Sequence, residues 1–198
     1  MIYQLSKNFA NTLKDHLQLA EDDLDQYIFG IEIFFVTLIK WGGLLGVGAL
    51  LGNLTEAFIF TIAFTLLRNR AGGLHFQSFY KCFFITLVLM ISSIYIVQII
   101  PSKENHLLML LLLSLTILLV FIYAPIDTPN KPLREEEKEI YRKQSRYIVL
   151  FLSILTLTFT LFIPAFLPYG TIISLSCFLE AITLPLGAWK NKKVSIEA

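Results

Sequence analysis

One short polar stretch of the sequence places a histidine and a cysteine close together between two apolar segments. The stretch runs from Arg68 to Cys82, with His75 seven residues before the cysteine and a Gly72-Gly73 pair before the histidine. A thiolate is a strong nucleophile, but a free cysteine is mostly protonated at neutral pH and needs a nearby base or positive charge. A histidine and a cysteine brought together could therefore break an acyl bond such as a peptide bond.

This pair can act together only if the backbone between its two members is not one regular helix. Seven residues of a continuous helix rise about 10.5 Å, which is too far for a hydrogen bond from imidazole to sulfur. The Gly72-Gly73 pair could end the preceding helix in a left-handed cap and let His75 fold back. Cys82 would then lie in the first turn of the next helix, beside Lys81 and the positive helix N-terminus. The residues alone leave a second interpretation open, in which His75 is an interfacial hydrogen-bonding residue and Cys82 an inert apolar side chain.

The composition indicates that these residues lie at a membrane. The 198 residues are 56% hydrophobic and 16% charged, whereas a soluble domain is about 45–50% apolar and about 25% charged. The mean hydropathy is +0.68. These values disfavour a soluble enzyme, a disordered chain and a disulfide scaffold, and two cysteines form no framework. A net charge of +1 gives no indication of a nucleic-acid partner.

The apolar segments predict an all-α, polytopic membrane protein with about six transmembrane helices, since one crossing needs about 20 residues. Residues 1–26 predict an amphipathic helix on the membrane surface, although a packed helix of a cytosolic subdomain would have the same pattern. The chain is expected to form a single membrane domain, 1–198. After residues 1–26 it divides into a first hairpin (27–67), a catalytic segment (68–82), a second hairpin (83–123), a cytoplasmic charged loop (124–146), a third hairpin (147–189) and a basic tail (190–198). In the first hairpin, the glycines at 42, 43, 46, 48 and 52 predict a turn between two short crossings.

The positive charges predict the orientation of these segments. With both termini in the cytoplasm, all but two of the 16 Lys and Arg residues fall on the cytoplasmic side. The exceptions are Lys40, inside the first hairpin, and Lys103, in the turn of the second. We therefore expect an N-in, C-in topology.

Four ionisable residues fall inside predicted spans, where such residues are costly and often functional: Glu32, Lys40, Glu56 and Glu180. Glu32 and Lys40 lie eight residues apart, so an ion pair or a snorkelling lysine is as good an explanation as chemistry. A dyad of His75 and Cys82 is the simplest arrangement. Four side chains could serve as a third member that orients His75: Glu32, Glu56, Glu180 and Gln77. Cys177 is expected to pack inside the last span.

The polar stretch resembles the accessory gene regulator B family, whose members are bacterial membrane endopeptidases that process quorum-sensing propeptides. The resemblance rests on Arg68, Ala71-Gly72-Gly73, His75 and Cys82. A second block from Ala124-Pro125 to Pro132, after a span and before a charged helix, is also similar to that family. Phe76 departs from it, because small residues are common at this position in relatives, and this could change the shape of the substrate groove.

The resemblance implies a mechanism and a set of partners. Cys82 would attack a peptide bond of a short propeptide, and His75 would act first as general base and then as the acid that protonates the leaving amine. A thiol of the propeptide would then displace Cys82 from the thioester and close a thiolactone, or a serine would close a lactone. Arg68, Gly72 and Gly73 would support the site. The resemblance implies no metal and no cofactor, and a place in the bacterial cytoplasmic membrane.

Several further residues have two interpretations each. Arg68 could be a positive-inside anchor, and the charged loop could be a solvated helix that fixes the topology. Alternatively, a set of polar residues would bind the propeptide, with an attraction that weakens in salt: Gln77, Lys131, Arg134, Arg142 and Arg146. Glycines at 42, 43, 46 and 48 would permit close contact within a monomer or across a homodimer. The competing class of protein is a small transporter or scaffold without catalysis, which the absence of an evident inverted repeat disfavours.

Overall fold

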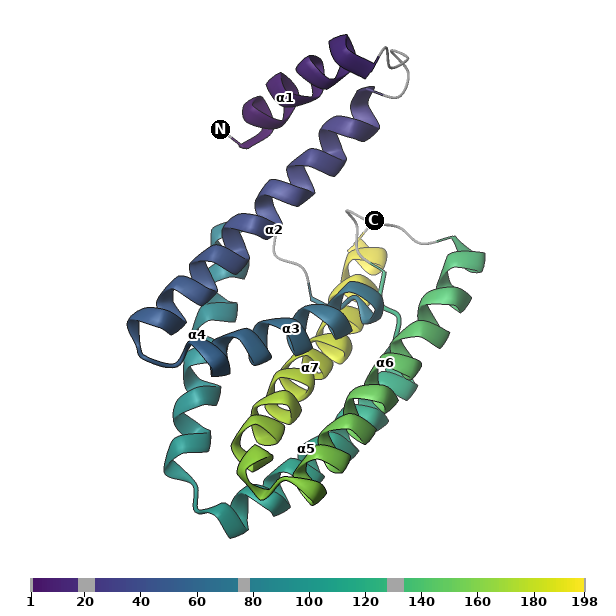
Figure 1. Ribbon diagram of the computed structural model, residues 1–198. Coiled ribbons are helices and arrows are strands. Elements are labelled where there is room, and N and C mark those ends of the chain that lie inside the picture. The colour runs from purple at the N-terminus through teal and green to yellow at the C-terminus, as the bar shows by residue number, and fades with distance from the viewer. Residues whose placement is uncertain (1, 18–23, 75–78, 128–133, 198) are drawn as a thin grey trace. The chain divides into compact units, whose positions relative to one another are not determined.

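Nearly all of the chain is helical. The computed structural model describes residues 2–17, 24–74, 79–127 and 134–197, and among these residues the only extended pairing is one isolated bridge between Gly72 and Ile126 (Figure 1). The helices are α1 (Ile2–Leu17), α2 (Leu24–Leu50), α3 (Leu54–Ala71), α4 (Phe79–Ile99), α5 (Ser102–Tyr123), α6 (Glu135–Phe162), the short 3₁₀ helix η2 (Pro164–Phe166) and α7 (Leu167–Glu197). The predicted all-α class is confirmed.

Five of the helices are long and apolar enough to cross a bilayer. They are α2, α4, α5, α6 and the stretch Pro164–Lys192 that includes α7. The helix α3 is not among them, because its 18 residues include Glu56 in the first turn and Arg68 and Arg70 in the last. A multi-pass membrane protein is therefore shown, whereas six crossings and the N-in, C-in orientation remain predictions.

The helix ends agree with the predicted segments in most places and differ in two. The glycines at 42, 43, 46 and 48 lie inside α2, and the chain turns only at Gly52, which has a φ of 73°. The predicted charged loop and the span that follows it share one continuous helix, α6, which begins at Glu135.

The chain forms two compact units, residues 1–47 and 48–198. The first contains α1 and most of α2, and within it the rings of Phe9 and Phe35 meet edge to face with centroids 6.2 Å apart. In the second unit, α7 contacts α3, α4, α5 and α6, so it is the helix around which this bundle is arranged.

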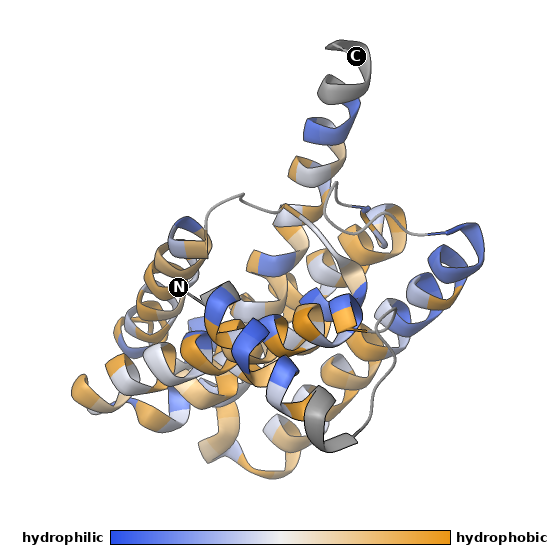
Figure 2. Cartoon of the chain, turned by 90° about the horizontal axis from the view of Figure 1, so that it is seen from above, coloured by the Kyte–Doolittle hydropathy of each residue, from blue (hydrophilic) through white to orange (hydrophobic). Residues whose placement is uncertain are grey.

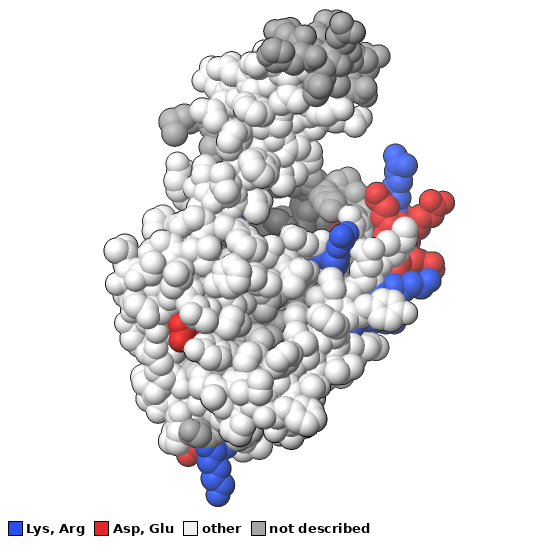
Figure 3. All heavy atoms as spheres, viewed as in Figure 1, with Lys and Arg blue, Asp and Glu red and all other residues white. Residues whose placement is uncertain are grey.

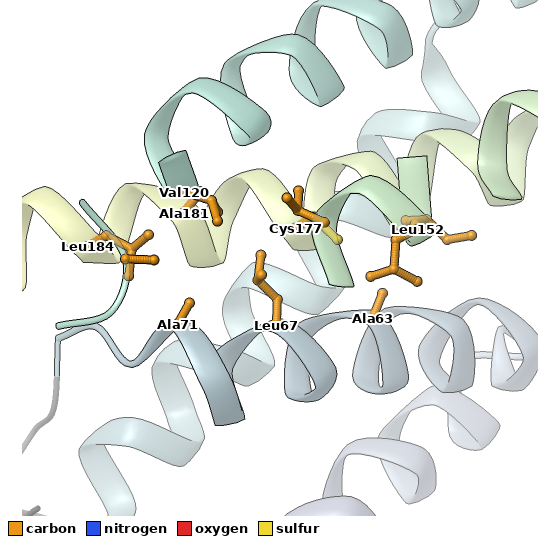
Figure 4. Close-up of a cluster of buried hydrophobic side chains, with 11 residues drawn as sticks. Ala63, Leu67, Ala71, Val120, Leu152, Cys177, Ala181 and Leu184 are labelled. Atoms are coloured by element: carbon orange, nitrogen blue, oxygen red, sulfur yellow. The ribbon is translucent and has the colours of Figure 1, made fainter. Parts of the chain in front are cut away.

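The core of the second unit lies where α3, α5 and α6 meet α7 (Figure 4). Cys177 and Ala181 of α7 face Leu67 and Ala71 of α3, and all four are buried. Small side chains let helices approach closely. In a bilayer, where the hydrophobic effect does not drive helices together, this close packing supplies much of the attraction between them. Cys177 thus packs inside the last span, as predicted.

The outer sides of the helices are apolar, as lipid contact requires. Figure 2 shows hydrophobic residues along the flanks of the helices, and many large ones are exposed, including Phe84 on α4 and Phe151 on α6. On the face drawn in Figure 3, charged side chains gather mainly near the first turns of α6 and at the opposite end of the bundle, with a largely uncharged flank between. This distribution fits a protein whose two ends face water.

Candidate functional site

The helix before the candidate cysteine ends at the glycine pair. The last residue of α3 is Ala71, and the amide of Gly72 donates to the Arg68 carbonyl at 3.1 Å. Gly72 and Gly73 then have φ values of 78° and 120°, which favour glycine over residues with a side chain. The ψ of Gly72 is −134°, so the cap is not the left-handed helical one that the sequence suggested. The predicted break between Gly72 and Cys82 is confirmed at the glycine pair, because α3 ends at Ala71 and neither glycine has helical backbone angles.

Cys82 lies in the first turn of α4, as predicted, and is half-buried. Its carbonyl accepts a hydrogen bond from the Thr86 hydroxyl at 2.9 Å. The N-terminal turn of a helix favours negative charge. His75 and Gln77 lie outside the described residues, and their predicted roles stay predictions.

Arg68 connects three parts of the site. One of its terminal nitrogens, Nη1, donates to Oε2 of Glu180 at 2.7 Å, and the other, Nη2, donates to the carbonyl of Leu74 at 2.7 Å. Its guanidinium also interacts electrostatically with the Cys82 thiol. Burial by itself would lower the pKa of Arg68, but Glu180 and Cys82 act in the opposite direction, and the pKa of Arg68 is raised. A permanent positive charge therefore lies between the glycine-rich segment and the candidate nucleophile.

Glu180 is the buried partner of this arginine. It lies on α7 with no exposed surface, and its other oxygen, Oε1, accepts from the Thr183 hydroxyl at 3.3 Å. The sequence marked Glu180 as an ionisable residue within a span and as one candidate to orient His75, and the structure shows Arg68 as its ion-pair partner. Glu56 is at the opposite end of α3 from Arg68, about 18 Å along the helix. Glu32 and Lys40 lie on α2, in the first unit.

The second motif block packs directly against the glycine pair. The amide of Ile126 donates to the Ala71 carbonyl at 2.9 Å, and a side chain at Gly72 would collide with the Ile126 carbonyl. From α7, Gly187 leaves room for the same segment, since a Cβ there would lie 3.1 Å from the carbonyl carbon of Gly73. The side chain of Asn191 donates to the carbonyl of Asp127 at 2.6 Å. Two blocks about 50 residues apart in the sequence thus form one site with the end of α7.

The predicted propeptide-binding residues of the charged loop have different surroundings. Lys131 lies outside the described residues. Arg134, just before α6, and Arg142 are exposed. Arg146 instead donates to the Phe121 carbonyl at 3.1 Å, and its guanidinium stacks on the Phe121 ring at 4.8 Å. Arg134 and Arg142 could therefore reach a peptide, whereas Arg146 fastens α6 to α5.

One contact at this end of the bundle was not expected from the sequence. Lys138, near the start of α6, bridges Asp127 at 3.1 Å and Glu135 at 2.9 Å. The bridge ties the second motif block to α6. The sequence showed only that Asp127 lies in a proline-rich block before a helix with basic residues. It did not specify that Asp127 pairs with Lys138.

The long apolar helices of the described residues define a multi-pass membrane protein. The broken helix α3, the half-buried Cys82 and the buried ion pair of Arg68 and Glu180 form its candidate site. A family model described as accessory gene regulator B matches residues 6–184. The chain belongs to this family, as its sequence motifs indicated.

Relatives support the assignment over most of the chain. An AgrB-like protein of Clostridium acetobutylicum is 30% identical over 182 residues, which is 91% of this chain and 84% of the relative. An AgrB-like protein of Listeria innocua is 26% identical over 91% of this chain and 86% of its own length. No solved structure matches the chain. The family is one of peptide processing, so its membership indicates a general role in processing an autoinducer propeptide.

Proposed function

We propose that this protein is a cysteine endopeptidase of the bacterial cytoplasmic membrane that cleaves a short propeptide and promotes its cyclisation. The observation that carries the proposal is the position of Cys82. It lies in the first turn of α4, the helix that follows the break at Gly72 and Gly73 in the sequence, and it interacts electrostatically with Arg68. A helix N-terminus and a guanidinium are two of the devices that favour a reactive thiolate. Family membership favours this function over the competing transporter or scaffold.

The reaction would proceed in two acyl transfers. The Cys82 sulfur attacks the carbonyl carbon of the scissile peptide bond, His75 accepts the thiol proton, and the carbon–nitrogen bond breaks as His75 returns the proton to the leaving amine. The thioester so formed is then attacked by a thiol of the same propeptide. A thiolactone forms as the bond from the acyl carbon to the Cys82 sulfur breaks, and Cys82 takes up the proton that the propeptide thiol has lost. A serine hydroxyl in place of that thiol would give a lactone.

Cyclisation requires that the internal thiol reacts before water does. Thioester exchange is nearly balanced in free energy, whereas hydrolysis is strongly downhill, so the outcome must be decided by rate. Holding the propeptide thiol near the acyl carbon raises its effective concentration. A half-buried sulfur at the lipid boundary limits the access of water at the same time.

The remaining site residues would act around this centre. Arg68, Gly72 and Gly73 would shape and charge the site, and the basic residues of the charged loop would attract an acidic part of the propeptide. Arg134 and Arg142 are the described residues best exposed for that contact. A second copy of the chain would be a further partner, and Gly42 and Gly46 of α2 leave room for it, since a Cβ at either would meet nothing within 4 Å.

The test is co-expression of the protein with the small open reading frames encoded near it, followed by mass spectrometry of the peptides. Cys82→Ala should abolish cleavage and leave the protein in the membrane, because one small side chain replaces another. Cys82→Ser should lower activity steeply, since a hydroxyl ionises less readily and leaves less easily. His75→Ala should slow cleavage about 10²–10⁴-fold through loss of proton transfer. In the active protein, Cys82 should form an acyl adduct that hydroxylamine removes.

Cys177→Ala is the matched control. Cys177 is fully buried in the core among α3, α6 and α7, so its loss should leave cleavage unchanged and stability at most slightly lower. Cleavage that survives Cys82→Ala but is lost with Cys177→Ala would contradict the proposed mechanism.

A further inference from the structure

The buried pair of Arg68 and Glu180 joins two helices that carry different parts of the site. Arg68 is the fourth residue from the end of α3, and Glu180 lies 112 residues later on α7. The side chain of Arg68 is 17% exposed and that of Glu180 is not exposed at all. Charges are rarely buried in this way unless they are paired, because each loses its hydration.

The arginine uses its two terminal nitrogens for different partners. While Nη1 is bound to Glu180, Nη2 holds the carbonyl of Leu74, the last described residue of the segment that begins at Gly72. Leu74 lies between the glycine pair and α4, the helix that carries Cys82, and the positive charge of Arg68 also interacts with this cysteine. The planar fork of arginine makes the two hydrogen bonds possible, since a lysine could not serve two acceptors in fixed directions.

From this arrangement we propose that Glu180 is a positioning residue, which acts on the thiol chemistry through Arg68. Glu180 holds the guanidinium where it binds the Leu74 carbonyl, between the glycine pair and the helix that carries Cys82. Thr183 steadies the carboxylate by donating to its second oxygen. The importance of Glu180 for catalysis rests on the proposed function. Its control over the reactivity of Cys82 can be measured without a substrate.

Loss of the carboxylate has a definite physical consequence. A buried guanidinium without its counter-ion is costly, and arginine near a membrane surface can extend its long side chain toward water. Arg68 would then leave both the Leu74 carbonyl and the thiol. The thiolate would lose its positive neighbour, so Cys82 would react more slowly.

The experiment measures alkylation of Cys82 by iodoacetamide at pH 7 in the full-length protein in membranes. The Cys177→Ala variant serves as background, so that Cys82 is the only cysteine. Three variants are compared in that background: Arg68→Gln, Glu180→Gln and the double variant. The double variant replaces an ion pair by two neutral amides and so avoids an unpaired buried charge, which keeps the test informative if either single variant folds poorly.

We expect each single variant to be alkylated about tenfold more slowly, as an opposite charge removed from an ionisable group would produce. The double variant should be no slower than Arg68→Gln alone, because Glu180 acts only through Arg68. Slower alkylation would indicate that Glu180 positions Arg68. Faster alkylation would indicate a loosened fold, because loosening would expose the half-buried thiol. With the propeptide, Glu180→Gln should lower kcat and leave KM nearly unchanged.

Two variants serve as controls. Glu135→Gln removes an exposed carboxylate that pairs with Lys138, and Ser174→Ala removes a buried hydroxyl of α7 that donates to the Gly170 carbonyl. Neither should change alkylation. Unchanged alkylation of Glu180→Gln would overturn the inference, and so would additive slowing in the double variant. Either result would leave the proposed function standing, because that function fails only if Cys82 proves dispensable for cleavage.

Discussion

Gly73 occupies a place where no side chain fits. Its φ is 120°, and a Cβ would collide with the Thr183 hydroxyl and lie 3.1 Å from Oε1 of Glu180. We expect Gly73→Ala to reduce cleavage strongly, because the backbone strain costs about 1–3 kcal/mol and the methyl group displaces the side chains that steady Arg68. Cleavage of the co-expressed propeptide, normalised to the amount of protein in the membrane, checks this prediction.

Gly42→Ala and Gly46→Ala are the comparison for Gly73→Ala. Both glycines lie within α2, and a Cβ at either would meet nothing within 4 Å in the described structure. Alanine is also the better helix former, so these variants should fold well. If Gly73→Ala were as active as they are, the crowding at Gly73 would have no functional meaning.

Local spacing was enough to find most of the candidate residues but not Glu180's partner. Arg68, the glycine pair and Cys82 lie within 15 positions of each other, so their meeting at one helix break follows from chain geometry. Glu180 was recognisable as an unusual carboxylate in an apolar segment. Its pairing with Arg68 depends on how α7 packs against α3, and no pattern within either helix specifies that.

At the scale of elements, the short segment after α5 is as much a part of the site as the helices. Its Ile126 amide donates to Ala71, the last residue of α3, and Asp127 contacts α6 and α7 through Lys138 and Asn191. Ile126→Pro should lower cleavage, since proline removes the donor and loses about 1 kcal/mol of hydrogen bonding next to the glycine pair. The measurement is cleavage at equal protein level.

Ile126→Val tests whether the hydrogen bond or the side chain matters. Valine keeps the backbone amide and most of the apolar contact that Ile126 makes with the core. It should therefore process the propeptide nearly as the native chain does. An equal loss of activity in both variants would show that the backbone pairing is not what holds the segment in place.

The ends of the helices were predictable where the apolar runs and the helix-breaking residues indicated the same boundary. The start of α4 and the end of α5 lie where the apolar runs begin and end, and Gly72 and Gly73 mark the break before α4. The cluster of glycines in α2 was a weaker guide to the position of the turn, because glycine is common in membrane helices. The chain turns at Gly52, which has a positive φ and lies after α2 ends at Leu50. The merging of the charged loop with α6 could not be foreseen, since charged and apolar halves of one helix look like two segments.

At the scale of the whole molecule, contacts between loops fix how the helices of the second unit are paired. Gly72 meets Ile126 after α4 and α5 have been traversed, and Asn191 meets Asp127 after α6 and α7. Each pair of helices therefore leaves from one end of the bundle and returns to it. The predicted sharing of one side by the catalytic segment, the charged loop and the basic tail agrees with these contacts.

The number of crossings depends on whether α3, the first helix of the second unit, crosses the bilayer. With 18 residues it is about 27 Å long, close to the thickness of about 30 Å that a crossing helix must span. If α3 crosses, residue 7 lies on the same side as residues 138 and 192, and only residue 103 lies on the other. If it does not, residue 7 and residue 138 lie on opposite sides, and the positive charges are divided between the two faces. The strong asymmetry of Lys and Arg favours the first arrangement.

Single cysteines can decide between these arrangements. They are introduced in turn at Lys7, Lys103, Lys138 and Lys192 in a Cys82→Ser, Cys177→Ala background, and intact cells are treated with a maleimide that does not cross the membrane. We expect labelling at position 103 alone, with the other three reacting only after the cells are opened. Labelling of positions 103 and 138 from the same side would contradict the hairpin of α4 and α5 as well as the six-span topology. Labelling of position 7 together with 103 would show instead that α3 lies along the membrane and that five helices cross it.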